Sequence, residues 1–533
     1  MYGFNANFLD FLKPRLSIGF LTMADAQDRR VWRYYDVKKS ETDHRSYRGL
    51  ELVNGIRVCL ISDRTISRAS VVLDANVGYF NDPPDMQGLA CLCQRVMILG
   101  TSKQRRCNQF RQFLFNRGGV FASTTTADHT SFYVNVKSVH FRSVLGRFVH
   151  IFLTPLFKED WIEREAKIID LEWKDNLKCD LQRVHEFDKF TASNAHPYSK
   201  LLTGNEETLS KIPKLRGVNV RERLLEFFGS NYSGNRMSLC VCSNDTLDNL
   251  EKLVLDLFCR INGTTFHFLS IYDHPFQHPE EFCVKWYLIP KTPIKFVRII
   301  FPLPFQITNY WSYQHLDFIC HLLEHAGEDT LLQYLKIKNW CHDIAADIVE
   351  YAAGVNFLKI DFNVTAIGIM YAEDIIMHFF QYLKLFSDKL LIRRSSIQYA
   401  QLEWLFNTFI DTKEEKEKLE DNFNHLEMFK IVQTMQRRVF IKELSINRPR
   451  SGEFNLDLIH WLLKNYIKPK YIRIYSVARE NLTEVPWTSI GPKRCNGLRY
   501  YEEKLDESII DIWRKSDTKS MRLPRTREFL RQQ

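Results

Sequence analysis

The order of strand-like and helix-like segments occurs twice along this 533-residue chain. The first unit has strand patterns at 47–62, 68–80, 119–138 and 235–243, with helices at 88–101 and 160–190. The second has strand patterns at 284–290, 296–305 and 353–365, with helices at 311–325 and 371–410. Two successive units of about 240 residues indicate an internal duplication. We therefore predict an α+β fold of two homologous domains, each a mixed or antiparallel sheet packed with helices.

Turn signals and changes in composition set the predicted boundaries. They are an N-terminal extension (1–45), a first domain (46–271), a linker (272–282), a second domain (283–525) and a tail (526–533). Asn54-Gly55, between two alternating runs, predicts a hairpin near the start of the first domain. The linker begins YDHPFQHPEE, whose two prolines and several charges are typical of a connection.

Charge, apolar runs and cysteine content make several classes of protein unfavoured. The net charge is +9, but the lysines and arginines are interspersed with 64 acidic residues, which does not favour nucleic-acid binding. No apolar run reaches the roughly 18 residues of a membrane span, and the first 26 residues do not favour a cleavable signal. Twelve cysteines show no disulfide framework. We expect a cytoplasmic protein with reduced thiols, and a mitochondrial location is the alternative.

Helices at equivalent places in the two units share a short sequence. The tripeptide LEW occurs at 171–173 and again at 402–404. Glu172 follows Cys91 by 81 positions, and Glu403 follows His321 by 82. This spacing supports the duplication and singles out these four residues.

Several blocks, in order, resemble one known family. They are YRGLELVNGIRVCLISD, DPPDMQGLA, LGT, DHTSFYV, HPYSKLLTGN and HPFQ. In this order they resemble the insulysin family of the pitrilysin-type, inverted-motif zinc metallopeptidases. The similarity runs from Tyr47 to the tail RLPRTREFL, and it implies that the chain corresponds to the N-terminal half of such an enzyme, with Zn²⁺ as the family's cofactor.

In that family a helix carries H-x-x-E-H, and a glutamate about 77 residues later completes the zinc site. The two histidines and that glutamate hold Zn²⁺, and the motif glutamate removes a proton from the bound water. The resemblance places Cys91 and Arg95 at the histidine positions and Gln94 at the base position. Glu172 retains the third ligand, and Glu165 retains a supporting carboxylate.

Each replacement is chemically adverse to catalysis. Gln94 cannot accept a proton, which removes a contribution of roughly 10²–10⁴-fold. A guanidinium about 5 Å from a divalent ion repels it by several kcal/mol at an effective dielectric near 20. We therefore expect Arg95 to pair with Glu172 or Glu165 in place of a metal, and we expect no cofactor.

The strand that the family uses to hold substrate is also altered. It reads FASTTTADHT here, so Ala122 replaces the asparagine that the family usually carries, followed by Ser123 and Thr124. These three residues are the predicted substrate contacts of the first unit.

The second unit contains one literal H-x-x-E-H, in HLLEH. It offers His321, His325 and Glu403 as metal ligands and Glu324 as base. The resemblance places this match in a repeat that is normally non-catalytic, where the following turn helps to hold the substrate's N-terminus. Gly327 lies in that turn, and Asp329 stands where a second glycine is expected.

Three hypotheses follow. The first is an inactive pseudo-metalloprotease that binds peptides or regulates an intact insulysin-type paralogue. The second is an active zinc endopeptidase that uses the HLLEH site. The third is a subunit that acts with a partner half, in a homo- or hetero-oligomer.

Overall fold

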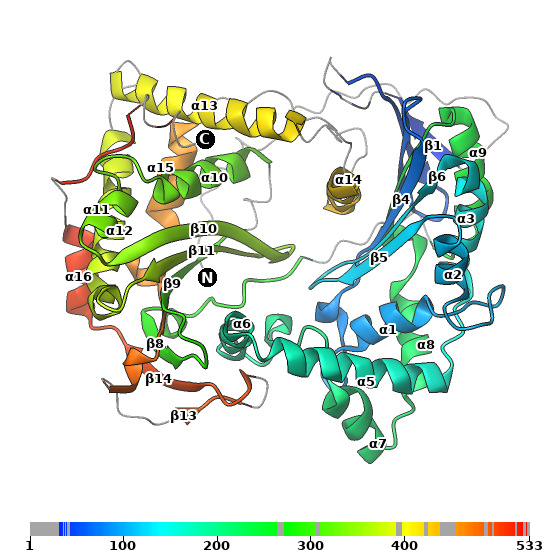
Figure 1. Cartoon of the computed structure of the whole chain (residues 1–533), viewed down its shortest axis with the longest axis horizontal. Coiled ribbons are helices and arrows are strands. Elements are labelled where there is room, and N and C mark those ends of the chain that lie inside the picture. The colour runs from blue at the N-terminus through cyan, green and yellow to red at the C-terminus, as the bar shows by residue number, and fades with distance from the viewer. Residues whose placement is uncertain are drawn as a thin grey trace.

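The computed structural model contains two seven-stranded sheets, one in each predicted unit. The structure describes residues 31–35, 37, 39, 43–263, 271–304, 310–390, 397–419, 425–437, 454–483, 489–492, 495–516, 520–525 and 529. Figure 1 shows the two sheets at opposite sides of the molecule, with α6 and α14 between them. The α+β fold and the duplication are therefore confirmed.

The first sheet has the order β1-β2-β3-β7-β4-β6-β5. Its strands are β1 (Val31–Tyr34), β2 (Ser46–Leu52), β3 (Arg57–Ser62), β4 (Arg68–Ala75), β5 (Val120–Thr125), β6 (Thr130–Lys137) and β7 (Met237–Ser243). The helices are α1 (Leu89–Met97), α2 (Gln109–Phe115), α3 (Phe141–Phe148), α4 (His150–Leu153), α5 (Glu159–Asn176), α6 (Asp180–Phe190), α7 (Ile212–Leu215), α8 (Val220–Asn231) and α9 (Leu247–Phe258). The predicted hairpin joins β2 and β3, with Gly55 at φ 86°.

The second sheet repeats this arrangement with the order β10-β11-β9-β12-β8-β14-β13. Its strands are β8 (Val284–Ile289), β9 (Phe296–Leu303), β10 (Cys341–Ala352), β11 (Val355–Val364), β12 (Arg473–Val477), β13 (Ser489–Ile490) and β14 (Arg499–Lys504). The helices are α10 (Tyr310–Glu324), α11 (Leu331–Ile337), α12 (Ala372–Leu390), α13 (Ile397–Leu419), α14 (His425–Arg437), α15 (Leu456–Asn465) and α16 (Glu507–Lys515). Each sheet has one parallel pair, β3 with β7 and β8 with β12, so β5 and β10 are equivalent edge strands.

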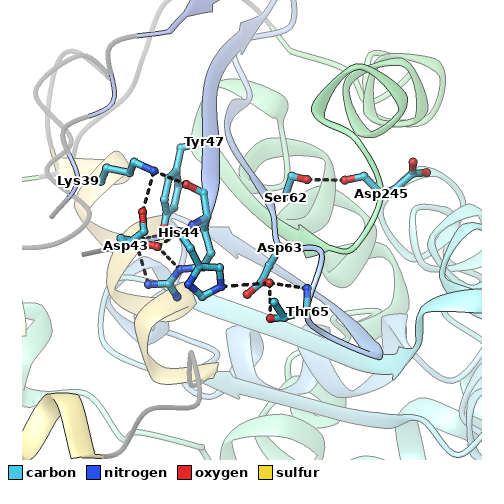
Figure 2. Close-up of polar contacts among 9 residues, drawn as sticks. Lys39, Asp43, His44, Tyr47, Ser62, Asp63, Thr65 and Asp245 are labelled. Carbon is cyan, nitrogen blue, oxygen red and sulfur yellow. Dashed lines mark hydrogen bonds and ion pairs between the residues drawn. The ribbon is translucent and has the colours of Figure 1, made fainter. Parts of the chain in front are cut away.

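The first sheet begins inside the predicted extension 1–45, because β1 pairs with β2. Figure 2 shows how the chain entering β2 is fixed by polar contacts. The Tyr47 hydroxyl donates to Asp43 at 2.6 Å, and Lys39 Nζ donates to the carbonyls of Asp43 (2.8 Å) and Arg45 (2.6 Å). These contacts extend the order of the sheet beyond the strand pattern that starts near Tyr47.

One predicted helix is divided in the structure. The pattern over 160–190 predicts a single helix, but α5 ends at Asn176 and α6 begins at Asp180. The Asp180 carboxylate accepts the backbone N–H groups of Lys291 (3.0 Å) and Thr292 (2.7 Å) of the second unit. This long-range anchor turns α6 toward the second sheet, and the local pattern carries no sign of it.

The predicted linker is packed between the two units. Phe276 is buried in it, and the Arg473 guanidinium lies 3.7 Å from its ring centroid. Beside them, buried Asp188 accepts hydrogen bonds from the hydroxyls of Tyr198 and Tyr475. The connection is thus part of a buried polar and aromatic interface that joins the two units.

Helix α14 crosses from the second unit to the first sheet (Figure 1). Its Met428, Ile431, Val432 and Met435 form a buried cluster with sheet residues such as Val72. The Ser238 hydroxyl donates to the Val432 carbonyl at 2.8 Å. One face of the first sheet is therefore covered by a helix that follows it by nearly two hundred residues, as the 194-residue separation of this pair shows.

Candidate functional site

The start of α1 is set by a buried carboxylate. Asp82 accepts the backbone N–H groups of Gly88 (2.6 Å) and Ala90 (2.7 Å), which are unpaired donors of the first helical turn. Gly88 lies at φ 95°, and a Cβ there would be 2.3 Å from the Thr203 carbonyl oxygen. We call Cys91, Gln94 and Arg95, at the family's motif positions, the degenerate motif. Because the start of α1 is fixed, the directions of these three side chains are fixed as well.

Arg95 projects from α1 toward two carboxylates of α5. Its guanidinium forms a hydrogen-bonded ion pair with Glu172, and its Nη1 lies 3.7 Å from Glu165 Oε2. The other Glu165 oxygen lies 3.7 Å from Arg164. The expected pairing of Arg95 with Glu172 and Glu165 is confirmed, and both carboxylates are neutralised by arginine.

Cys91 is buried one turn before Arg95, with 7% of its surface exposed. Burial raises the pKa of its thiol to about 11, although the nearby Arg95 opposes the shift. The side chain is therefore a neutral thiol at pH 7 and adds no negative charge to the position.

Gln94 connects α1 to the edge strand. Its Nε2 donates to the Ser123 hydroxyl at 2.5 Å, and the amide is buried. Strand side chains alternate between faces, so Ser123 faces α1 while Ala122 and Thr124 are exposed on the opposite face. The three predicted substrate contacts are thus divided between the two faces of β5.

The donors at this position do not fit a zinc site. A guanidinium has no lone pair to offer a metal, and it remains protonated at any physiological pH. The remaining family ligand, Glu172, is already engaged by that cation. Apart from that engaged carboxylate, Cys91 is the one family ligand position whose side chain can bind a metal, and it carries a neutral thiol, so a set of three free ligands is not formed.

The second motif has its own internal contacts. His325 is buried, and its Nδ1 accepts the Gly327 N–H at 3.0 Å. The His321 and His325 rings lie 6.3 Å apart, and the ring of Phe529 contacts both, at 5.1 and 5.5 Å. Both imidazoles are therefore packed against an aromatic ring from the predicted tail.

Glu324 also bonds to an edge strand, but it accepts from a backbone group, whereas Gln94 donates to a side chain. The Oε1 of Glu324 accepts the Ala346 N–H of β10 at 2.7 Å, and burial raises the pKa of its carboxyl. Gln94 and Glu324 occupy the same place in the two repeats, three residues after Cys91 and His321. Each unit thus uses this helix position to fasten its edge strand.

Two further predicted residues of the second unit are Glu403 and Asp329. Glu403 is half-buried on α13. Asp329 has φ 59°, the left-handed conformation that favours glycine, and its carboxylate lies 3.0 Å from Arg522. Among the residues that the structure describes, no group of three or more His, Cys, Asp or Glu side chains is placed to hold a metal ion.

A pocket of about 330 Å³ lies beside the degenerate motif, between α1, α2, α5 and β5. Four of the predicted site residues line it, Gln94, Arg95, Ser123 and Glu165, and so does Arg111 of α2, whereas Cys91 and Glu172 do not. Sequence reasoning missed Arg111. Its position on the helix that follows the motif was the only available signal.

Two family profiles match the chain in succession. The insulinase profile (Peptidase family M16) matches residues 57–205, and the profile of the Peptidase M16 inactive domain matches residues 219–391. His321, Glu324 and His325 lie within the second match, and Glu403 lies beyond it.

Individual relatives agree with these profiles. The chain is 32% identical to insulin-degrading enzyme of Homo sapiens over 497 residues, which covers 93% of this chain and 47% of that protein. It is 32% identical to A-factor-processing enzyme of Saccharomyces cerevisiae over 378 residues, covering 70% and 35%. The crystal structure of pitrilysin matches the fold with a TM-score of 0.80 at 22% identity, covering 93% of this chain and 51% of that one.

The chain therefore belongs to the insulinase (M16) family of peptidases, and the family resemblance of its sequence is confirmed. The match spans about half the length of insulin-degrading enzyme and about a third of A-factor-processing enzyme. In the described part of the chain, no helix combines the length and apolar character needed to cross a bilayer.

Proposed function

We propose that this chain is a catalytically inactive member of the M16 family, a pseudo-metallopeptidase that binds peptides without cleaving them. One observation carries the proposal: the Arg95 guanidinium lies between Glu172 and Glu165, where the family resemblance places a zinc ligand. A permanent cation at this position opposes Zn²⁺ by charge and takes the carboxylates that would bind it.

The position of the general base supports the same conclusion. Gln94 is an amide, which accepts no proton at neutral pH, and its donor is engaged by Ser123. A metal bound weakly by other groups would thus still lack the side chain that activates its water.

Peptides are the proposed ligand class because the edge strand is retained. β5 ends the sheet, and no strand among the described residues pairs with its outer edge, so a peptide can pair there as an added strand. The curated relative insulin-degrading enzyme is named for a polypeptide substrate. A peptide bound along β5 would lie beside a site that lacks the family's zinc-binding histidines and its general base.

Hydrolysis of a quenched-fluorescent peptide library tests the proposal, with an intact M16 peptidase as the positive control. We expect no hydrolysis by this chain with or without added zinc. Hydrolysis that a chelator abolishes would contradict the proposal, and the variants Gln94→Ala and Glu324→Gln would then show which repeat is responsible.

We also propose that the chain acts as a regulatory partner subunit. The proposed assembly is a homo- or hetero-oligomer that includes an insulysin-type paralogue. Light scattering of the chain alone and mixed with an intact relative tests this idea, and monomers in both samples would contradict it. A cytoplasmic location remains our expectation, which cell fractionation tests; one relative is named peroxisomal.

A further inference from the structure

The pocket beside the degenerate motif has an unusual distribution of charge. Two arginines line it, Arg95 and Arg111, against one carboxylate, Glu165, so the lining carries one excess positive charge. Glu165 is already shared between Arg95 and Arg164, and Arg95 also pairs with Glu172. Arg111 makes no ion pair with any described residue, and it is the cation left to a ligand.

Arg111 is held in place by an aromatic ring. Its Cζ lies 5.0 Å from the ring centroid of Phe121, the second residue of β5. A guanidinium stacked on an aromatic face keeps its edge donors available for a planar partner. The Asn108 side chain lines the same pocket and offers a neutral donor beside it.

The pocket lies where a bound strand would place a side chain. Phe121 and Ser123 share one face of β5, since residues two apart in a strand point the same way. Ser123 lines the pocket, and Phe121 supports Arg111. A peptide paired with the outer edge of β5 places every second side chain on this face, next to the pocket.

We propose that this pocket binds a carboxylate of a peptide paired with β5, and that Arg111 is the residue that selects it. This inference rests on the peptide binding proposed above and adds a preference for acidic ligands. A carboxylate matches both the planar fork of a guanidinium and the single excess charge of the lining. A phosphate carries up to two charges, which one unpaired arginine does not balance.

The test uses the full chain and peptides that differ in one group. The probe is the heptapeptide Thr-Val-Thr-Glu-Thr-Val-Thr, labelled at its N-terminus and amidated at its C-terminus, and its partner has Gln in place of Glu. A third peptide ends at the Gln with a free carboxylate, and a fourth is the amide of the third. Fluorescence anisotropy gives each dissociation constant.

If a side chain supplies the carboxylate, the Glu peptide binds about tenfold more tightly than the Gln peptide. If the C-terminus supplies it, the third peptide exceeds the fourth by a similar factor. Either preference supports the inference and identifies the source.

Arg111→Gln should abolish the preference, so that the Glu and Gln peptides bind with equal affinity. Arg117→Gln is the matched control, because Arg117 also stacks on a ring, 3.6 Å from the centroid of Phe113, and does not line the pocket. We expect this control to keep the wild-type preference.

Equal affinities for acidic and uncharged peptides would overturn the inference, and so would a preference that survives Arg111→Gln. Both results would leave the proposed peptide binding intact. Failure of every peptide to bind would contradict peptide binding along β5, and the carboxylate preference with it.

Discussion

The Arg95 guanidinium donates a hydrogen bond to the Glu172 carboxylate, although 77 positions separate the two residues. The contact joins α1 to α5 at the place where the family resemblance puts one histidine and one glutamate around a metal. An ion pair between two side chains therefore joins the two helices at this position.

Restoring the family's residues at the three motif positions should restore metal binding. The triple variant Cys91→His, Gln94→Glu, Arg95→His regains two imidazoles beside Glu172, and we expect it to bind about one zinc per chain. Elemental analysis after dialysis measures this. The double variant Cys91→His, Gln94→Glu, which retains Arg95, is the matched control and should remain metal-free. Equal zinc in the two variants would show that Arg95 is not the obstacle.

Arg95 should also contribute to stability. Arg95→Ala leaves Glu165 and Glu172 without their common partner, and we expect a loss of about 1 kcal/mol, because Glu172 is half exposed. Chemical denaturation measures the loss, which should shrink at high salt. Arg164→Ala, an exposed arginine near Glu165, should change stability by less than about 0.5 kcal/mol.

His325 should be needed for the fold of the second unit and not for zinc. His325→Ala removes the acceptor for the Gly327 N–H and a buried ring that stacks on Phe529, which should cost about 1–3 kcal/mol. Its zinc content should equal that of wild type. The opposite result, one zinc per wild-type chain that disappears in His325→Ala and persists in Cys91→Ala, would support the HLLEH site.

The interface between the units should weaken in acid because of His274. Burial lowers the pKa of its imidazole to about 4, whereas an unfolded histidine titrates near 6.5. The unfolded chain thus binds the proton first, so stability from the neutral ring is complete above about pH 6.5 and is lost as the pH falls toward 4.

Between pH 7.5 and 4.5 this linkage should cost about 2–3 kcal/mol. His274→Asn should lose that part of the pH dependence in denaturation curves. His342→Asn, at an exposed position of β10, should retain it. A His274→Asn curve parallel to wild type would contradict the assignment.

Local sequence patterns predicted much of this fold, because a hairpin or an amphipathic helix depends on residues that are close together in the sequence. Asn54-Gly55 located the first hairpin, and the apolar run at 296–305 located β9. Strand β10 was missed because it is an edge strand whose buried, intermediate and exposed residues do not alternate regularly. The position of α14 on the first sheet depends on contacts between distant segments, which no window of sequence contains.

The candidate site shows the same limit. Spacing within one helix placed Cys91, Gln94 and Arg95 together, and the repeated LEW led to Glu172. The excess charge at Arg111 was not predictable, since it depends on which carboxylates are already taken by Arg95 and Arg164.

Addition of Co²⁺ or Zn²⁺ to the purified wild-type chain tests the central claim most directly, because Co²⁺ bound to a thiolate absorbs visibly and zinc can be counted. The account predicts no cobalt–thiolate absorption and no stoichiometric zinc after dialysis. About one metal per chain, lost in both Cys91→Ala and Glu172→Ala, would contradict it.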